Sequence, residues 1–316
     1  MTHGFDFRRI RSWELALALF AVSAPFVLPI ANGQQAGFIG TAVAEEMQKA
    51  DTSKLVSIGG SLTEIIFALG EEGRLVGRDS TSVYPEAANK IPDVGYMRAL
   101  SPEGVMAINP TAIIAVEGSG PPEALALLKS ANIPFETVPE KFDRDSIISK
   151  ILAVGKFLGV DDKAKALADK VSADLDAAVA EAEKRPGSER KRVLFILSLR
   201  DGKVMASGTN TAANGIITLS GAINATGDYE GYKPLSDEAI IEAKPDVILM
   251  MDRGGSHSGN NDDLRANPAL GLTPAVQNSA VIRMDGHYLL GFGPRTAESI
   301  RDLSGKIYGK PAHVSQ

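Results

Sequence analysis

Short apolar runs alternate with amphipathic stretches between residues 54 and 140. Strands are predicted at the apolar runs, which are rich in aliphatic and β-branched residues: 55–58, 75–78, 112–116 and 135–138. Helices are predicted in the stretches between them: 62–69, 102–108 and 121–130. Strands that alternate with short helices predict βαβ units on a parallel sheet.

A long helical segment follows this first group. Residues 143–184 are rich in Ala, Leu, Lys and Glu, with a break at Gly159 and a new start at Asp161-Asp162. The second piece, 162–184, is expected to be about 34 Å long at 1.5 Å per residue, which exceeds one small lobe. The βα pattern then resumes, with strands predicted at 193–197, 247–251 and 280–284, and helices at 211–219 and 294–308.

The whole pattern predicts an α/β protein with two βα lobes, each with a central parallel-type sheet. One long interlobe helix joins the lobes, and a ligand cleft is expected between them. The predicted boundaries are an N-terminal lobe at 45–142, a helical segment at 143–188 and a C-terminal lobe at 189–316.

Two stretches, 100–114 and 235–249, align without a gap, so the lobes are predicted to be pseudo-repeats. Leu, Ser, Glu, Pro and Ile recur at matching places, and each copy predicts a Ser cap, a short helix and a buried strand. Glu103 and Glu238 occupy equivalent places in the two copies. A carboxylate at the start of a helix interacts favourably with the helix dipole. Two matched anions would also suit docking to a basic, two-fold symmetric partner. These roles are compatible.

The first 44 residues differ in kind from the rest. A basic start precedes an apolar run at about 15–30, and Ala42-Val43-Ala44 supplies a small-x-small cleavage signature. This is the layout of a secretory signal peptide cleaved after Ala44. The alternative is a transmembrane anchor, but Pro25 and Pro29 interrupt the run and a span needs about 20 apolar residues.

The composition of the chain excludes several kinds of functional site. The 316 residues include no cysteine, which excludes disulfides, thiolate metal sites, a cysteine nucleophile and a lipid-modified cysteine. A formal net charge of −6 argues against a nucleic-acid-binding surface. Neither Gly118-Ser119-Gly120 nor Gly291-Phe292-Gly293 completes a dinucleotide-binding G-x-G-x-x-G motif before a helix. We therefore expect a protein that is not an enzyme and has no catalytic cofactor.

The most specific signal lies between Arg78 and Gly104. It includes Arg78-Asp79-Ser80-Thr81-Ser82, then Val94-Gly95-Tyr96-Met97-Arg98, and it is joined near the end by Leu289-Leu290-Gly291-Phe292-Gly293. These strings resemble the periplasmic haem-binding proteins of ABC haem importers, in the rigid-helix class that also serves cobalamin and siderophore uptake. The resemblance covers about residues 54–308. It implies capture of ferric haem b between the lobes, as cargo, and delivery to an inner-membrane ABC permease with its ATPase.

The resemblance implies that Tyr96 is the axial ligand of the haem iron and that Arg98 supports it. It also implies that Glu103 and Glu238 dock on the permease. The chemistry is suitable, because a tyrosine oxygen is a hard anionic ligand for ferric iron, and a nearby cation favours the phenolate. Residues two apart in an extended segment point to one side, so Arg98 is expected beside Tyr96. Without the resemblance, a tyrosine after a Pro-Asp-Val-Gly turn, here residues 92–95, is more often a packed loop aromatic.

Other haem contacts are predicted from position. Just after the first strand of the C-terminal lobe, some family members have a histidine that ligates a second stacked haem. This chain has no histidine there but has Arg200, which cannot ligate iron and could pair with a propionate, so we expect one haem per protein. Arg253 is a candidate partner for a haem propionate. The remaining candidates are second ligands or walls of the cleft: His257, His287, Tyr229 and Tyr232. The alternative to a ligand role is that His257 is a solvated loop residue and that Tyr229 and Tyr232 serve ordinary packing.

The expected product is an exported monomer in the periplasm of a Gram-negative bacterium. Its expected partners are haem, the permease and an outer-membrane haem receptor system upstream, with no nucleic acid. The lack of cysteine favours this location, because a Gram-positive binding protein is usually tethered through a lipid-modified cysteine. A cobalamin- or ferric-siderophore-binding relative is the first alternative, and an α/β enzyme that uses the interlobe cleft is the second.

Overall fold

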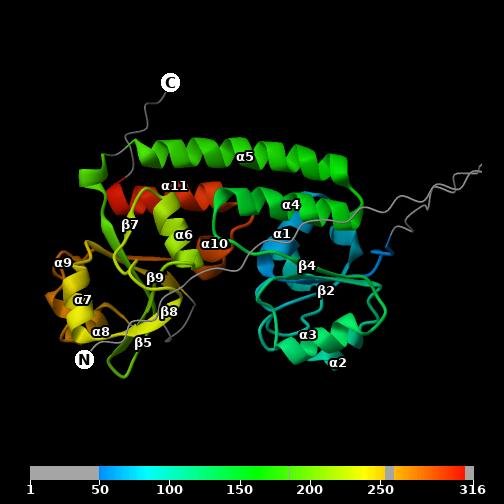
Figure 1. Ribbon diagram of the computed structural model, residues 1–316, viewed down its shortest axis with the longest axis horizontal. Coiled ribbons are helices and arrows are strands. Elements are labelled where there is room, and N and C mark those ends of the chain that lie inside the picture. The colour runs from blue at the N-terminus through cyan, green and yellow to red at the C-terminus, as the bar shows by residue number, and fades with distance from the viewer. Residues whose placement is uncertain (1–49, 185, 253–259, 310–316) are drawn as a thin grey trace, which may run out of the picture. The chain divides into compact units, whose positions relative to one another are not determined.

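The computed structural model describes residues 50–184, 186–252 and 260–309, which form two sheets with helices packed around them (Figure 1). The predicted signal peptide with its cleavage site lies outside the described residues, as do Arg253 and His257. In the described part of the chain, no helix is long and apolar enough to cross a membrane.

The first sheet, sheet A, is wholly parallel, as the alternating pattern predicted, with the strand order β2-β1-β3-β4. Its strands coincide with the predicted apolar runs: β1 (Leu55–Ile58), β2 (Leu75–Arg78), β3 (Ala112–Val116) and β4 (Phe135–Val138). Every residue of β1 and β3 is buried, as expected where helices cover both faces of a parallel sheet. The connections contain α1 (Gly60–Ala68), η1 (Glu72–Arg74), η2 (Glu86–Lys90), α2 (Pro102–Met106) and α3 (Pro122–Lys129).

The second sheet, sheet B, is mixed, with the order β10-β9-β5-β6-β8 and β7 (Ile223–Asn224) paired to β5. Parallel pairing joins β5 (Arg192–Arg200), β9 (Val247–Asp252) and β10 (Val281–Asp285). Antiparallel pairing joins β6 (Lys203–Ser207) to β5 and to β8 (Tyr232–Leu235). Asp201 and Gly202 have positive φ values of 49° and 73°, which suit a tight hairpin turn. That hairpin makes β6 the antiparallel member of sheet B.

The remaining helices surround sheet B. They are α6 (Ala212–Leu219), α7 (Asp237–Ala243), α8 (Asn261–Ala266), α9 (Pro274–Gln277), α10 (Gly286–Leu290) and α11 (Thr296–Tyr308), with the short turns η3 (Gly187–Glu189) and η4 (Leu270–Leu272). We call sheet A with its helices the N-lobe, and sheet B with its helices the C-lobe.

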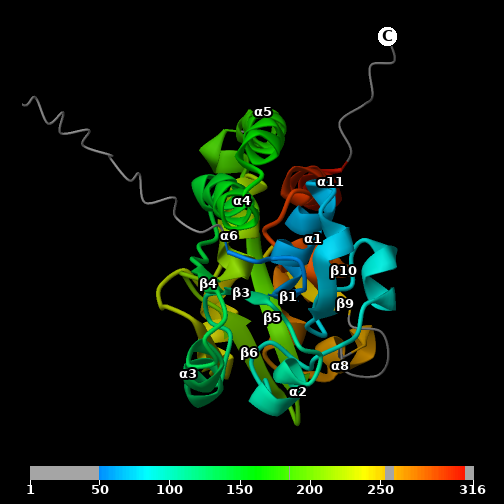
Figure 2. The same ribbon diagram turned by 90° about the vertical axis from the view of Figure 1, so that its right-hand side faces the viewer.

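One long helix, α5 (Asp161–Glu183; 23 residues), runs past the elements of both lobes (Figure 1) and is seen nearly end-on in Figure 2. It follows α4 (Arg144–Leu158), and Gly159 between them adopts the left-handed conformation with φ 67°, which confirms the predicted break. The two helices pack closely at Gly155, where a Cβ would lie 2.0 Å from the Cβ of Ala164. A side chain at Gly155 would therefore force α4 and α5 apart.

A continuous apolar core extends from one lobe to the other along α5. It contains residues of β1 and β3 from sheet A and of β5 and β9 from sheet B. One face of α5 enters this core at helical spacing: Ala164, Ala168, Val171, Leu175, Ala178 and Ala182. Each sheet has a further core cluster of its own. The long helix is therefore packed along its length rather than spanning open solvent.

The internal repeat has a structural counterpart. Helix α2 starts at Pro102 and α7 at Asp237, while β3 starts at Ala112 and β9 at Val247, so both elements keep an offset of 135 residues. In each copy a serine caps the helix and accepts a hydrogen bond from a backbone N–H of the first turn. The predicted pseudo-repeat is confirmed for these two elements.

Candidate functional site

The segment that leads to Tyr96 begins at the end of β2 and is built around Asp79, whose carboxylate is fully buried (0% exposed). Its Oδ1 accepts hydrogen bonds from the Gly59 N–H (2.9 Å) and the Ser82 hydroxyl (2.7 Å). Its Oδ2 accepts from the N–H (3.0 Å) and the hydroxyl (2.7 Å) of Thr81. Gly60 allows this approach, because a Cβ there would lie 2.8 Å from the Thr81 carbonyl oxygen. Asp79 therefore ties the loop after β2 to the loop after β1.

Replacing Asp79 with asparagine is expected to destabilise the protein by about 3 kcal/mol, because an amide has one acceptor oxygen for four donors and leaves buried donors unpaired. Equilibrium unfolding in urea measures this change. The matched control is Asp162→Asn, an exposed carboxylate in the first turn of α5, which should lose less than about 1 kcal/mol. Equal losses in the two variants would contradict the role given to Asp79.

The chain then returns alongside β2. The Arg78 N–H donates to the Pro92 carbonyl (2.9 Å), and the Val94 N–H donates to the Arg78 carbonyl (2.9 Å). The Arg78 guanidinium also donates to the Asp93 carboxylate at 2.9 Å. Gly95 follows with φ 103°, a conformation that glycine adopts without steric cost. The backbone leading into Tyr96 is therefore held against the end of a buried strand.

The side chain of Tyr96 is 45% exposed. Its backbone is held, because its carbonyl accepts from the Ala99 N–H (2.8 Å) and the next carbonyl, that of Met97, accepts from the Gly120 N–H (2.8 Å). Among the residues that the structure describes, none makes a hydrogen bond to the phenol oxygen of Tyr96. A fixed backbone thus presents a phenol that is available to a ligand, near the carboxyl ends of parallel strands, where α/β proteins commonly bind ligands.

Tyr96 and Arg98 do not lie in an extended segment, so the predicted strand alternation that put Arg98 beside Tyr96 is wrong. The hydrogen bond from the Ala99 N–H to the Tyr96 carbonyl closes a turn with Met97 and Arg98 at its centre, so this segment is not extended. The alternation of side chains along a strand therefore does not apply. Arg98 is exposed. Its supporting role stays a prediction.

The C-lobe brings two further candidates to one edge of sheet B. Arg200 is the last residue of β5 and is exposed, and His287 lies in α10 directly after β10. The Nδ1 atom of His287 is 4.0 Å from the nearer Asp285 carboxylate oxygen. Because β5, β9 and β10 are parallel neighbours, both residues lie at the carboxyl ends of these strands.

The two C-lobe tyrosines are less well placed to meet a ligand at that edge. Tyr232 is the first residue of β8, and its ring centroid is 6.4 Å from that of Phe195, five positions before Arg200 in β5. Five residues at about 3.3 Å each put Phe195, and Tyr232 beside it, roughly 16 Å from the end of β5 at Arg200. Burial raises the pKa of the Tyr229 phenol, which disfavours a phenolate there. The half-exposed Tyr96 is therefore better placed than either of them to meet a ligand.

Glu103 and Glu238 have matching surroundings in the two lobes. The Ser101 Oγ donates to a Glu103 carboxylate oxygen (2.9 Å) and accepts from the Gly104 N–H (3.2 Å). The Ser236 Oγ accepts from the Ala239 N–H at 3.2 Å. In each lobe the backbone N–H of the glutamate itself, and then the serine hydroxyl, lowers the pKa of the glutamate carboxyl. Both carboxylates are fully exposed and stay charged at lower pH than an ordinary glutamate.

Replacing Ser101 with alanine is expected to raise the pKa of Glu103 toward its ordinary value, because the hydroxyl that favours the charged form is lost. The carboxylate would then lose its charge at a higher pH than in the parent. An NMR titration of the Glu103 side chain measures the change. Ser130→Ala, which removes a hydroxyl bonded only locally to the Leu127 carbonyl, is the control and should leave Glu103 unchanged. An unaltered Glu103 titration in Ser101→Ala would refute the assignment.

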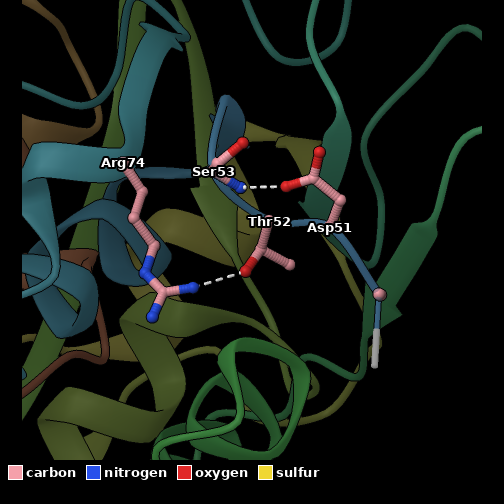
Figure 3. Close-up of a pocket in the computed structure, with 5 residues that line it drawn as sticks. Asp51, Thr52, Ser53 and Arg74 are labelled. Atoms are coloured by element: carbon pink, nitrogen blue, oxygen red, sulfur yellow. Dashed lines mark hydrogen bonds between the residues drawn. The ribbon is translucent and has the colours of Figure 1, made fainter. Parts of the chain in front are cut away.

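A pocket of sheet A lies away from these residues. Ala50–Ser53 and Arg74 line it, and the Arg74 guanidinium donates to the Thr52 hydroxyl at 2.6 Å (Figure 3). These residues precede β1 and β2, so the pocket is at the amino ends of strands whose carboxyl ends lead to Asp79 and Tyr96. It does not belong to the candidate site.

Two lobes of βα units, one long packed helix and a ligand-accessible side chain after a parallel strand together define a bilobal binding protein. Residues 55–288 match the family described as periplasmic binding protein. The chain belongs to the periplasmic binding protein family.

Solved structures of high similarity include two haem-binding proteins. The chain is 38% identical to the periplasmic heme-binding protein RhuT from Roseiflexus sp. RS-1, solved in apo form, with a TM-score of 0.77 over 81% of this chain and 98% of that one. It is also 38% identical to the periplasmic heme-binding protein BhuT in complex with two hemes, with a TM-score of 0.76 over 80% and 97% of the two chains. A curated relative from Bacillus subtilis (strain 168), the uncharacterized ABC transporter substrate-binding lipoprotein YvrC, is 28% identical over 82% of this chain and 81% of its own length.

Proposed function

We propose that the protein binds ferric haem through Tyr96 and delivers it to an ABC permease. The observation that carries the proposal is the half-exposed Tyr96 phenol, which has no hydrogen-bond partner in the described part of the chain and sits on a backbone held by Arg78 and Gly120. A phenolate is a hard ligand that suits ferric iron. The haem named for two similar structures supports haem as the cargo.

The other haem contacts are proposed by position. Arg98 lies in the same turn as Tyr96 and is the proposed supporting residue beside the haem. Arg200 and His287 lie at the carboxyl ends of the C-lobe strands, where a propionate or a haem face would meet them. We expect one haem per protein, because the position where some family members have a histidine has Arg200 instead, which does not ligate iron.

Proteins of this family supply substrates to ABC importers, so the proposed partner is an inner-membrane permease with its ATPase. Glu103 and Glu238 are the proposed docking residues, since the two lobes present them in equivalent, charged form. We further propose a monomer, exported to a Gram-negative periplasm after cleavage behind Ala44, with an outer-membrane haem receptor upstream. The protein carries its ligand unchanged and is not an enzyme.

Titration of residues 45–316 with ferric haem tests the proposal. We expect saturation at one haem per protein and an absorption spectrum typical of ferric haem with a tyrosinate ligand. The same protein titrated with cobalamin and with a ferric siderophore supplies the matched comparison. Tight binding of either alternative, with no saturable haem binding, would overturn the proposed function.

A further inference from the structure

Four charged side chains meet where the N-lobe contacts the C-lobe, and the proposed haem site uses none of them. Glu64 lies in α1, Glu140 follows β4, Lys150 lies in α4, and Arg295 directly precedes α11. Glu64 and Lys150 are only 8% and 1% exposed as whole residues. The Glu140 and Arg295 side chains are 16% and 22% exposed. Two carboxylates and two cations balance one another at a largely dry junction.

Arg295 of the C-lobe holds Glu64 of the N-lobe through three hydrogen bonds. The Arg295 backbone N–H donates to Oε1 of Glu64 (3.0 Å), and its Nε and Nη2 donate to Oε2 (3.1 and 3.0 Å). The guanidinium carbon also lies 3.4 Å from the ring centroid of Tyr84, in the N-lobe segment after β2. Gly293 keeps the approach open, because a Cβ there would lie 3.3 Å from the Glu64 carboxyl carbon.

Lys150 makes the second polar contact across the junction. Its Nζ donates to both Glu140 carboxylate oxygens (2.7 and 2.9 Å) and, within the N-lobe, to the Ser61 hydroxyl (3.2 Å). It also donates to the Phe292 carbonyl of the C-lobe at 3.2 Å. The Phe292 ring packs edge-on against that of Phe142, with centroids 5.4 Å apart. Residues 292–295 are thus held by both polar and apolar contacts.

We propose that the Glu64–Arg295 ion pair and the Lys150–Phe292 hydrogen bond form a latch that sets the angle between the two lobes. The long helix α5 connects the lobes covalently, whereas the latch connects them through non-covalent contacts. Its two main residues, Glu64 and Arg295, are 231 positions apart in the chain. Separating the lobes here would leave buried charges without partners, which is costly. Breaking one member of the pair should therefore release the lobe angle. The latch does not depend on which ligand the protein binds.

Spin-label distance measurements on the ligand-free protein test the latch. The chain has no native cysteine, so Ala126→Cys in α3 and Glu242→Cys in α7 give two unique, exposed labelling sites, one on each lobe. In the parent we expect one narrow distance distribution. In Arg295→Met and in Glu64→Gln we expect a second distance component, from molecules whose lobes have moved apart. Its population relative to the latched form should rise by roughly 30-fold over the parent, since truncating one partner of a buried charge pair costs about 2 kcal/mol or more.

Arg301→Met is the matched control, because Arg301 lies in α11, the helix that Arg295 directly precedes, and pairs with Asp174 of α5 instead of with the N-lobe. It should keep the narrow distribution of the parent. If Arg295→Met fails to fold, Arg295→Lys retains the charge but loses the two-pronged contact, and it should show the second component at a smaller population. Distributions in Arg295→Lys and Glu64→Gln that superimpose on the parent's would overturn the latch. Haem titration of the same variants is read separately and bears only on the proposed function.

Discussion

Replacing Tyr96 with phenylalanine is expected to weaken ferric haem binding by at least about 100-fold and to abolish the tyrosinate absorption of the bound haem. Loss of a group that merely orients a metal ligand typically costs about 10- to 100-fold in affinity, so loss of the ligand itself should cost at least as much as the upper end of that range. The substitution removes one oxygen and keeps the ring. The Ala99 N–H donates to the Tyr96 carbonyl, and the Ser80 N–H donates to the carbonyl of Gly95, the residue before Tyr96. Because these bonds hold the backbone and do not involve the phenol, the variant should fold as the parent does.

Haem titration with the absorption spectrum recorded at each step measures this effect. Tyr232→Phe is the matched control, since Tyr232 is also partly exposed but lies in β8, far from the strand ends that lead to the candidate site. Its haem affinity should stay within about two-fold of the parent's. An unchanged spectrum in Tyr96→Phe would remove Tyr96 as the iron ligand while leaving open which other residue binds haem in this protein.

Reversing both proposed docking charges, in Glu103→Lys combined with Glu238→Lys, is expected to reduce haem delivery to the permease by about 1,000-fold. At the proposed docking contact each reversal would place like charges opposite one another, and about 2 kcal/mol for each lobe corresponds to roughly 30-fold per site. Both glutamates are fully exposed and bonded only within their own helix starts, so haem affinity and unfolding free energy should change little.

Transport by the reconstituted permease, with haem-loaded binding protein supplied outside, measures this loss. The control is Glu123→Lys, which reverses an exposed carboxylate in the first turn of α3 and leaves the repeated pair intact. Delivery by the control should match the parent. Full delivery by the double variant would show that the two glutamates serve only as helix-start residues, the plainer of the two roles that their sequence positions allow.

Local sequence patterns predicted most of the secondary structure because hydrophobic period, caps and breakers act over a few residues. The four strands of sheet A and the break at Gly159 are examples. The hairpin between β5 and β6 was missed, although Asp201-Gly202 is a dipeptide typical of tight turns. The turn at Tyr96 was missed because nothing in its own residues signals the hydrogen bonds from Ala99 and Gly120.

The sequence by itself determined the two-lobe α/β architecture and the internal repeat, because these depend on periodicity. The choice of Tyr96 came from the resemblance of the strings between Arg78 and Gly104 to a known family. Only the tertiary structure decided that Asp79 organises the loop before Tyr96, since its partners come from the ends of two strands. Tertiary structure alone also brought Glu64 to Arg295. A carboxylate and a guanidinium that are far apart in the chain carry no sequence signal of their pairing. Their contact exists because packing along α5 brings the two lobes together and excludes water from between them.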